Sequence, residues 1–255
     1  QVPDMLHGKI LRSPHSHARI LSIDTSAAEV LPDVHAVLTP FNSPSGRVAP
    51  DLPILGTTVR YIGDEVAAVA ADSEHAAEEA LAALKVEYEV LPFVTDPREA
   101  IKSYAPAIHP EGNLIGGEPM VLSRGSIKEG FAEADIIVEE SFTTPAHASA
   151  ALEPRAAIAS WEGDKLTVWK TSRGVHPDKM SLASALQVEP DNVRVIGATM
   201  GAGYGNKDET RLAAIVAALA QNAGRPVKIE LTREEEFVAG RKRHSTETTI
   251  RVGVK

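Results

Sequence analysis

Three glycines at alternate positions, Gly201, Gly203 and Gly205, lie where the chain passes from a β-branched segment into one rich in Ala and Leu. The first segment, 193–196, is predicted to be a strand, and the second, from about 209 to 222, a helix. Glycine can adopt positive φ, and the first turn of a helix leaves main-chain N–H groups without partners. The pattern therefore predicts a loop that binds an anion or a polar ring edge. A tight strand-to-helix turn is the alternative, but three glycines in five positions favour a ligand.

The loop only partly resembles the two common nucleotide-binding motifs. Lys207 precedes Asp208 rather than Ser or Thr, so the magnesium-binding hydroxyl of a phosphate-binding P-loop is missing. A dinucleotide fingerprint needs glycine at its sixth position, which here is Asn206. Glu230 stands where the ribose-binding acid of that fingerprint could lie. A nucleotide-binding domain built on Gly201–Gly205 therefore remains an alternative hypothesis.

Other candidates for chemistry are weaker. His15 and His17 lie two residues apart and would share a face of a strand, as two metal ligands could. No third ligand lies nearby in the sequence, so we interpret them as part of a polar face and predict no metal site. Glu153 is a candidate for a buried carboxylate with a shifted pKa, although a hydrogen-bonded structural acid is commoner. A Gly-x-Ser-x-Gly nucleophile elbow is absent from the sequence, so nothing points to hydrolase chemistry.

Composition excludes several classes of protein. With 255 residues, 43% of them hydrophobic, the chain is long enough for one large or two ordinary domains. It has no cysteine, so it cannot itself ligate an iron–sulfur cluster. Without a signal peptide or an apolar run of about 18 residues, we expect a cytoplasmic protein that does not enter a membrane. The net charge of −9 makes nucleic acid an unexpected partner, and we interpret the basic run 241–244 as a solvated turn.

Periodicity and turn residues predict an α+β fold. Neither a regular alternation of strands and helices nor an internal repeat is present, which disfavours a doubly wound sheet. A long loop is expected over 39–53 and a candidate domain linker over 103–123, because Pro and Gly are frequent in both stretches. The predicted strands are 7–11, 19–23, 34–38, 66–70, 85–90, 136–144, 156–161, 166–171 and 227–232. Further helices are predicted from the cap Ser73 to about 84, from Ser126, and from Pro177 to about 186.

The segment Met200-Gly-Ala-Gly-Tyr-Gly-Asn-Lys207 resembles the Gly-Gly-Gly-Phe-Gly-(Gly/Asn)-Lys loop of the molybdenum hydroxylases. These form the xanthine dehydrogenase and aldehyde oxidase family, and the loop belongs to their large, molybdopterin-binding subunit. Further segments resemble the same subunit in the same order, namely 6–20, 59–67, 152–157 and 231–237. The resemblance implies a hammerhead α/β domain over 1–108, a linker over 109–123, and part of the first molybdopterin-binding domain over 124–255.

The resemblance also implies roles for individual residues. Gly203, Tyr204 and Gly205 match the loop whose backbone lies beside the oxo group of the molybdenum and the pterin, with Tyr204 in place of the usual Phe. Arg173 falls where most members have a glutamine that hydrogen-bonds a ligand of the metal. Arginine only donates and carries a fixed charge, so this departure suits an anionic substrate or marks an altered site. Asp208 stands where purine-oxidising members carry a substrate-binding glutamate.

In function, the resemblance implies oxidation of a C–H bond of an N-heterocycle or an aldehyde, with water as the oxygen source. Electrons would leave through [2Fe-2S] and FAD groups on partner subunits or domains. The glutamate that acts as the catalytic base lies near the far end of the family's large subunit, beyond Lys255. Because the sequence also opens at Gln1 without an initiator Met, we expect an N-terminal fragment whose partner is the missing C-terminal half. Such a fragment would hold no catalytic residue and be inactive alone. A structural or assembly domain that binds no ligand is the remaining alternative.

Overall fold

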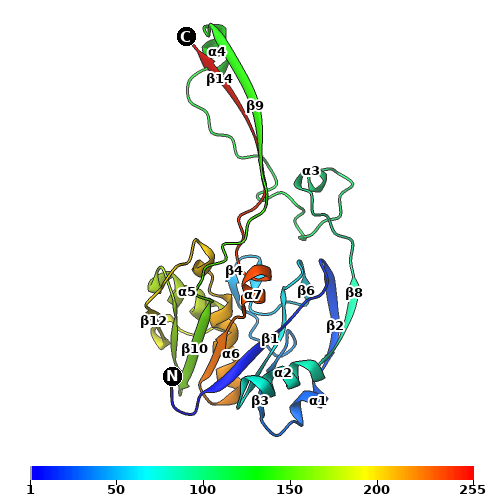
Figure 1. Cartoon of the computed structure of the whole chain (residues 1–255), viewed down its shortest axis with the longest axis vertical. Helices are drawn as coiled ribbons and strands as arrows, with labels where there is room; N and C mark the ends of the chain where they lie inside the picture. Colours follow the sequence, from blue (N-terminus) through cyan, green and yellow to red (C-terminus); the bar gives the residue numbers. More distant parts are fainter. Residues whose placement is uncertain (1) are drawn as a thin grey trace. The chain divides into compact units, whose positions relative to one another are not determined.

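A computed structural model describes residues 2–255 (Figure 1). The chain forms two compact units, each made from two separate stretches of sequence. The first unit runs to Phe93 and resumes over Ser149–Arg241, and the second comprises Val94–Ala148 and Lys242–Lys255. This division follows contacts in space. The domain boundaries at 108 and 124 follow the family pattern and stay predictions.

A seven-stranded sheet forms the centre of the first unit, in the order β12-β11-β10-β13-β1-β7-β3. Strand β1 pairs in parallel with β13 and antiparallel with β7, so the two stretches of this unit share one sheet. The mixture of parallel and antiparallel pairs confirms the predicted α+β class. The strand bounds are β1 Leu6–Arg12, β3 Val34–Leu38, β7 Glu65–Ala71, β10 Ala156–Glu162, β11 Lys165–Thr171, β12 Val193–Ala198 and β13 Val227–Glu230.

Strand β7 is buried on both faces, which explains its composition of small and β-branched residues. Ala68 and Ala70 face the core that contains helix α6 (Arg211–Ala223). Ala67 and Val69 face a second core that contains residues of helix α2 (Glu74–Ala83) and of a small sheet. That sheet has the order β6-β2-β8, with β2 at Ala18–Asp24, β6 at Thr58–Val59 and β8 at Lys85–Val90. Alternation along one strand thus divides the unit into two cores.

Local signals place most of the elements correctly. Ser73 Oγ accepts the N–H of Ala76 at 3.1 Å, which confirms the predicted cap of α2. Helix α5 begins at Val175 rather than at Pro177, but proline is still tolerated because first-turn N–H groups lack helical partners. The expected loop 39–53 contains a short hairpin, and the helix expected from about residue 209 begins at 211 after a 3-10 turn. The remaining elements of this unit are α1 Ser26–Glu29, β4 Arg47–Ala49, β5 Leu52–Pro53, α5 Val175–Leu186, η1 Pro190–Asn192, η2 Asn206–Asp208 and α7 Arg233–Val238.

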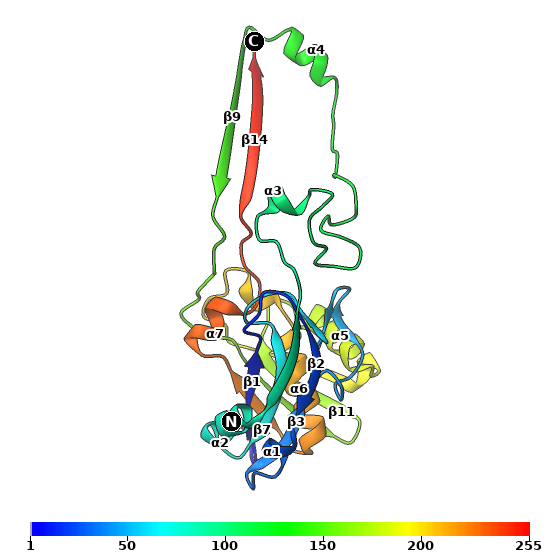
Figure 2. The same ribbon diagram turned by 90° about the vertical axis from the view of Figure 1, so that its right-hand side faces the viewer.

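The second unit is an antiparallel ribbon with two short helices. Strands β9 (Ile136–Thr144) and β14 (Thr246–Val254) lie side by side (Figure 2). Helix α4 (Ile127–Ala132) begins after its cap Ser126, as predicted, and α3 spans Pro97–Ala100. Within this unit no helix or strand occurs over 103–123, in agreement with the predicted loop. Across residues 2–255, no helix has the length and apolar character needed to cross a membrane.

Candidate functional site

The glycine loop lies at the edge of the sheet where two parallel strands end. Strands β11 and β12 pair in parallel, with Thr171 opposite Ala198 at their carboxyl ends. Arg173 follows β11 by two residues, and the loop 199–205 follows β12. In parallel sheets, ligands bind outside the carboxyl ends of the strands. The structure therefore brings two of the sequence-predicted groups to the kind of position where ligands bind.

The loop has a left-handed backbone at its tip. Gly205 has a φ of +85°, which explains the need for glycine there. Tyr204 has a φ of +49°, uncommon for a residue with a side chain, and that side chain is 68% exposed. The conformation is held by Ser149, whose hydroxyl donates to the Tyr204 carbonyl at 3.2 Å, and by an Asn206 N–H to Gly203 carbonyl bond of 2.9 Å. Backbone held in a rarely populated region often marks a functional site.

Glu153 stabilises the beginning of the loop by a hydrogen bond and an ion pair. Its Oε2 accepts the Gly201 N–H at 2.8 Å and pairs with the ammonium group of Lys207, whose side chain is buried. The hydrogen bond from Lys207 and that from the Gly201 N–H hold the pKa of Glu153 below its usual range. Glu153 is therefore the structural acid that the sequence pattern favoured. The N–H groups of Gly203 and Gly205, by contrast, have no hydrogen-bond partner within residues 2–255.

Arg173 and Asp208 form an ion pair beside the loop. Arg173 Nη1 donates to Asp208 Oδ2 at 2.8 Å. The Arg173 side chain is 66% exposed and that of Asp208 only 23%. The second carboxylate oxygen of Asp208, Oδ1, is buried and has no donor in the part of the chain that the structure describes. Both residues were candidates from the sequence, but no local signal indicated that they pair.

Glu236 joins the glycine loop to two other segments that resemble the family. Its side chain is 1% exposed and lies on α7. It accepts the backbone N–H of Arg155 at 2.6 Å, the Arg155 Nε at 3.2 Å and the Asn206 Nδ2 at 3.1 Å. The sequence pattern drew attention to the segment around Glu236 but not to this residue. The sequence offered one indication of its burial, namely that this glutamate precedes an apolar residue in a helical segment.

A second buried network extends towards the N-terminal strands. Arg211 Nη1 on α6 contacts Asp64 Oδ1 at 2.8 Å and Glu65 Oε2 at 2.5 Å. Glu65 also binds Arg12 at 3.1 Å, and Arg12 reaches Glu235 of α7 at 2.9 Å. Burial opposes the charged form of Glu65, but Arg211 and Arg12 lower its pKa overall. Buried ion pairs of this kind link the segments 6–12 and 59–67 to the elements that carry the loop.

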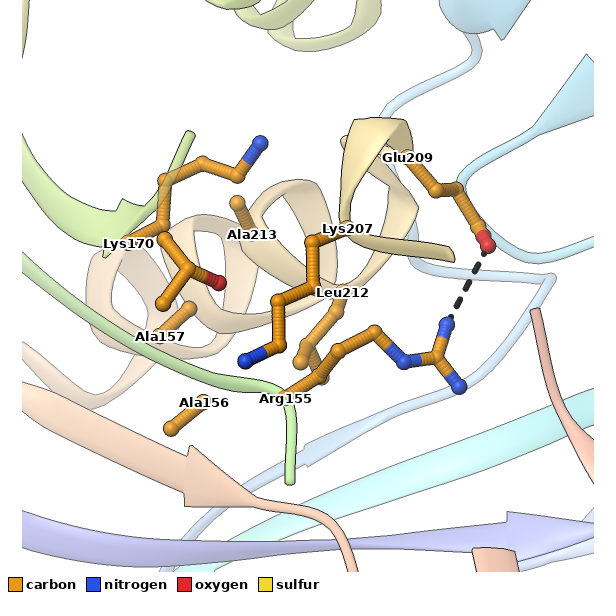
Figure 3. Close-up of a pocket in the computed structure, with 9 residues that line it drawn as sticks. Arg155, Ala156, Ala157, Lys170, Lys207, Glu209, Leu212 and Ala213 are labelled. Carbon is orange, nitrogen blue, oxygen red and sulfur yellow. Dashed lines mark hydrogen bonds and ion pairs between the residues drawn. The ribbon is translucent and has the colours of Figure 1, made fainter. Parts of the chain in front are cut away.

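A small pocket lies among Arg155, Lys170, Lys207 and Glu209 (Figure 3). Arg155 Nη1 lies 3.3 Å from Glu209 Oε2, the contact dashed in Figure 3. Burial raises the pKa of Glu209, and the charge of Glu65 adds to the effect. The pocket has space on the scale of one water molecule. It is therefore a packing defect lined by charges and cannot itself hold a substrate or a cofactor.

The two histidines make contacts within the first unit. His17 is buried, and its Nδ1 lies 2.7 Å from the carbonyl oxygen of Pro92. The His15 ring packs edge-on against Tyr88, with ring centroids 4.8 Å apart. Within residues 2–255, no group of three His, Asp or Glu side chains is placed to hold a metal ion. The two histidines lie in the bend before β2 rather than on a strand, and His17 is buried, so the predicted polar face is not formed.

The topology also disfavours a dinucleotide site. Glu230, the candidate ribose-binding acid, pairs with Lys228 at 2.7 Å. Strands β12 and β13, which flank the loop and α6, are separated in the sheet by β11 and β10. The dinucleotide fingerprint instead belongs to a βαβ unit whose two strands are neighbours. The glycine loop of this chain therefore does not lie in the βαβ topology that the dinucleotide fingerprint requires.

Comparison with known proteins identifies the family. Residues 108–255 match the model of the molybdopterin cofactor-binding domain, and residues 1–92 match that of the aldehyde oxidase and xanthine dehydrogenase a/b hammerhead domain. The chain belongs to the xanthine dehydrogenase and aldehyde oxidase family. This membership confirms the predicted resemblance and the order of a hammerhead domain followed by a molybdopterin-binding domain.

Relatives in this family cover nearly the whole chain. A probable xanthine dehydrogenase subunit of Bacillus subtilis (strain 168) is 37% identical over 98% of this chain and 34% of its own length. The nicotinate dehydrogenase large molybdopterin subunit of Eubacterium barkeri is 34% identical over 95% of this chain and 58% of its own length. Among solved structures, the aldehyde oxidoreductase from Desulfovibrio gigas superposes with a TM-score of 0.87 at 29% identity, covering 100% of this chain and 30% of that protein. The chain thus spans about a third of the length of the Bacillus and Desulfovibrio proteins.

Proposed function

We propose that this chain is part of a molybdopterin-dependent oxidoreductase that oxidises a C–H bond of an N-heterocycle or an aldehyde, with water as the oxygen source. Family membership supports this proposal, as do relatives named as xanthine and nicotinate dehydrogenase subunits. When bound, the molybdenum–molybdopterin group would supply the two-electron redox chemistry. [2Fe-2S] and FAD groups on partner subunits or domains would receive the electrons, and the catalytic glutamate would come from outside this chain.

The observation that carries the proposal is that two N–H groups of the loop backbone have no protein partner within residues 2–255. The N–H groups of Gly203 and Gly205 lack protein partners within residues 2–255, at the carboxyl edge of the sheet, while Glu153 and Lys207 hold the beginning of the loop. Main-chain donors without partners suit an oxo group or the polar edge of a pterin ring. The donor chemistry of the loop therefore fits the cofactor. In this assignment Gly203, Tyr204 and Gly205 bind the cofactor.

The two side chains of the ion pair complete the proposed site. Arg173 lies at the same edge of the sheet as the glycine loop and would stand beside the cofactor. Asp208 follows the loop directly and would be the acidic group nearest to a substrate. Both would act by orientation and electrostatics, because the redox chemistry belongs to the cofactor.

Metal and pterin analysis tests the proposal. We expect about one molybdenum and one pterin per full-length protein expressed with its partners, and neither in the isolated 255 residues. Gly203→Ala is the informative variant because the nearest protein atoms to its new Cβ, from Lys207 and Met200, are at 3.4 and 3.5 Å. The protein can accommodate this methyl group, so a loss of molybdenum would reflect a clash with the ligand.

Gly130→Ala is the matched control, because a Cβ added there meets no atom within 4 Å. It should leave molybdenum and pterin contents unchanged. Full-length protein that carries neither molybdenum nor pterin would contradict the proposed function and would favour a structural or assembly role.

A further inference from the structure

The Arg173–Asp208 pair places an exposed guanidinium group beside the glycine loop. The guanidinium group of Arg173 uses one N–H, on Nη1, to bind Asp208. Its other N–H groups make no hydrogen bond to the part of the chain that the structure describes. The Arg173 side chain is 66% exposed within residues 2–255. A planar guanidinium with free donors matches the geometry of a carboxylate.

Asp208 is placed to hold Arg173 rather than to contact a ligand itself. Its Oδ2 is taken by Arg173 Nη1, and its Oδ1 is buried. A substrate N–H would therefore have to share Oδ2 with Arg173, because Oδ1 is buried. The pair is neutral overall, and its more exposed group is the guanidinium rather than the carboxylate.

The other charged groups of the loop do not compete with Arg173. Lys207 has a buried side chain and is paired with Glu153. Glu153 also accepts the Gly201 N–H, so its charge is compensated on the protein side. The exposed ring of Tyr204 lies in the same loop and offers an apolar face for a planar group. Besides the main-chain N–H groups assigned to the cofactor, a ligand at this edge would thus meet the guanidinium group of Arg173 and the ring of Tyr204.

We propose that Arg173 is a specificity-determining residue that binds the carboxylate of an aromatic or heteroaromatic monocarboxylate, and that Asp208 is the positioning residue that holds its guanidinium group. This inference rests on the proposed function, because it concerns the substrate of the same site. It assigns Asp208 an indirect role in place of direct substrate contact.

Binding measurements on the molybdenum-loaded full-length protein test the inference without requiring turnover. The probes are pyridine-3-carboxylate and pyridine-3-carboxamide, which differ in charge but little in shape. Calorimetry should show tighter binding of the carboxylate by on the order of tenfold to a hundredfold, the range that hydrogen bonds to a charged group provide. This preference should weaken as the salt concentration rises, whereas binding of the amide should not.

Variants assign the preference to a residue. Arg173→Met should remove the difference in affinity between the carboxylate and the amide, and Arg173→Lys should retain part of that difference. Asp208→Asn should reduce the preference, because the guanidinium group loses its anchor. Arg194→Met is the matched control, since Arg194 is an exposed arginine on β12, and it should change neither affinity.

The outcomes separate this inference from the proposed function. Full-length protein without molybdenum would overturn the proposed function and the inference with it. Loaded protein that binds both probes equally, binds neither, or keeps its carboxylate preference in Arg173→Met would overturn only the role of Arg173.

Discussion

Replacement of Glu236 by alanine should strongly destabilise the first unit. Its carboxylate is almost completely buried and accepts hydrogen bonds from the backbone N–H and the Nε of Arg155 and from the amide of Asn206. The variant leaves the Arg155 backbone N–H, the Arg155 Nε and the Asn206 amide without this acceptor. Arg155 retains an ion pair with Glu209, so its charge stays partly compensated.

The magnitude follows from the cost of breaking a buried pair. Removal of one partner of a buried ion pair costs about 3–5 kcal/mol, and each buried donor left without an acceptor about 1–3 kcal/mol. These costs overlap because they concern the same groups, so we expect a loss of about 4 kcal/mol in the free energy of unfolding. Glu236→Gln keeps the shape of the side chain and one carbonyl acceptor, so we expect a smaller loss of about 2 kcal/mol in the free energy of unfolding.

Urea unfolding followed by tryptophan fluorescence measures this loss. The two tryptophans of the chain, Trp161 and Trp169, lie on β10 and β11 and so report on the sheet of the first unit. The control is Glu234→Ala, which removes an exposed glutamate from the same helix and should change stability by less than about 0.5 kcal/mol. If Glu236→Ala lay within about 1 kcal/mol of the parent, the reasoning that Glu236 anchors the loop would be refuted.

Two further predictions concern the loop itself. Because the pKa of Glu153 is lowered, its stabilisation of the loop is complete above the unfolded value of about 4.3 and is lost as pH falls through the folded value. Hydrogen exchange should show protection of the Gly201 amide that disappears in this acidic range, whereas Glu153→Gln should show weak protection at every pH. Gly205→Ala should cost about 1–2 kcal/mol because of its φ of +85°, and Gly205→Asn less, since asparagine tolerates this conformation better. Equal losses in urea unfolding would argue against backbone strain as the cause.

Local signals were enough to locate most elements. Strand β7, the cap Ser73 and the hairpin of β10 and β11 all depend on patterns that span a few residues, such as alternation, a capping hydroxyl or a turn. The start of α5 was misplaced by two residues, because a proline is acceptable throughout the first turn and does not define its beginning.

The sequence by itself determined the α+β class, the glycine loop between a strand and a helix, and membership of the molybdopterin-binding family. These properties are carried by residues close together in the chain or by the order of short segments. Only the tertiary structure decided that Arg173 pairs with Asp208, 35 residues away, and that Glu236 holds Arg155, 81 residues away. Charge alone does not choose a partner among the many acids and bases of the chain. The tertiary packing that brings the ends of β11 and β12 beside each other, and α7 beside the start of β10, makes that choice.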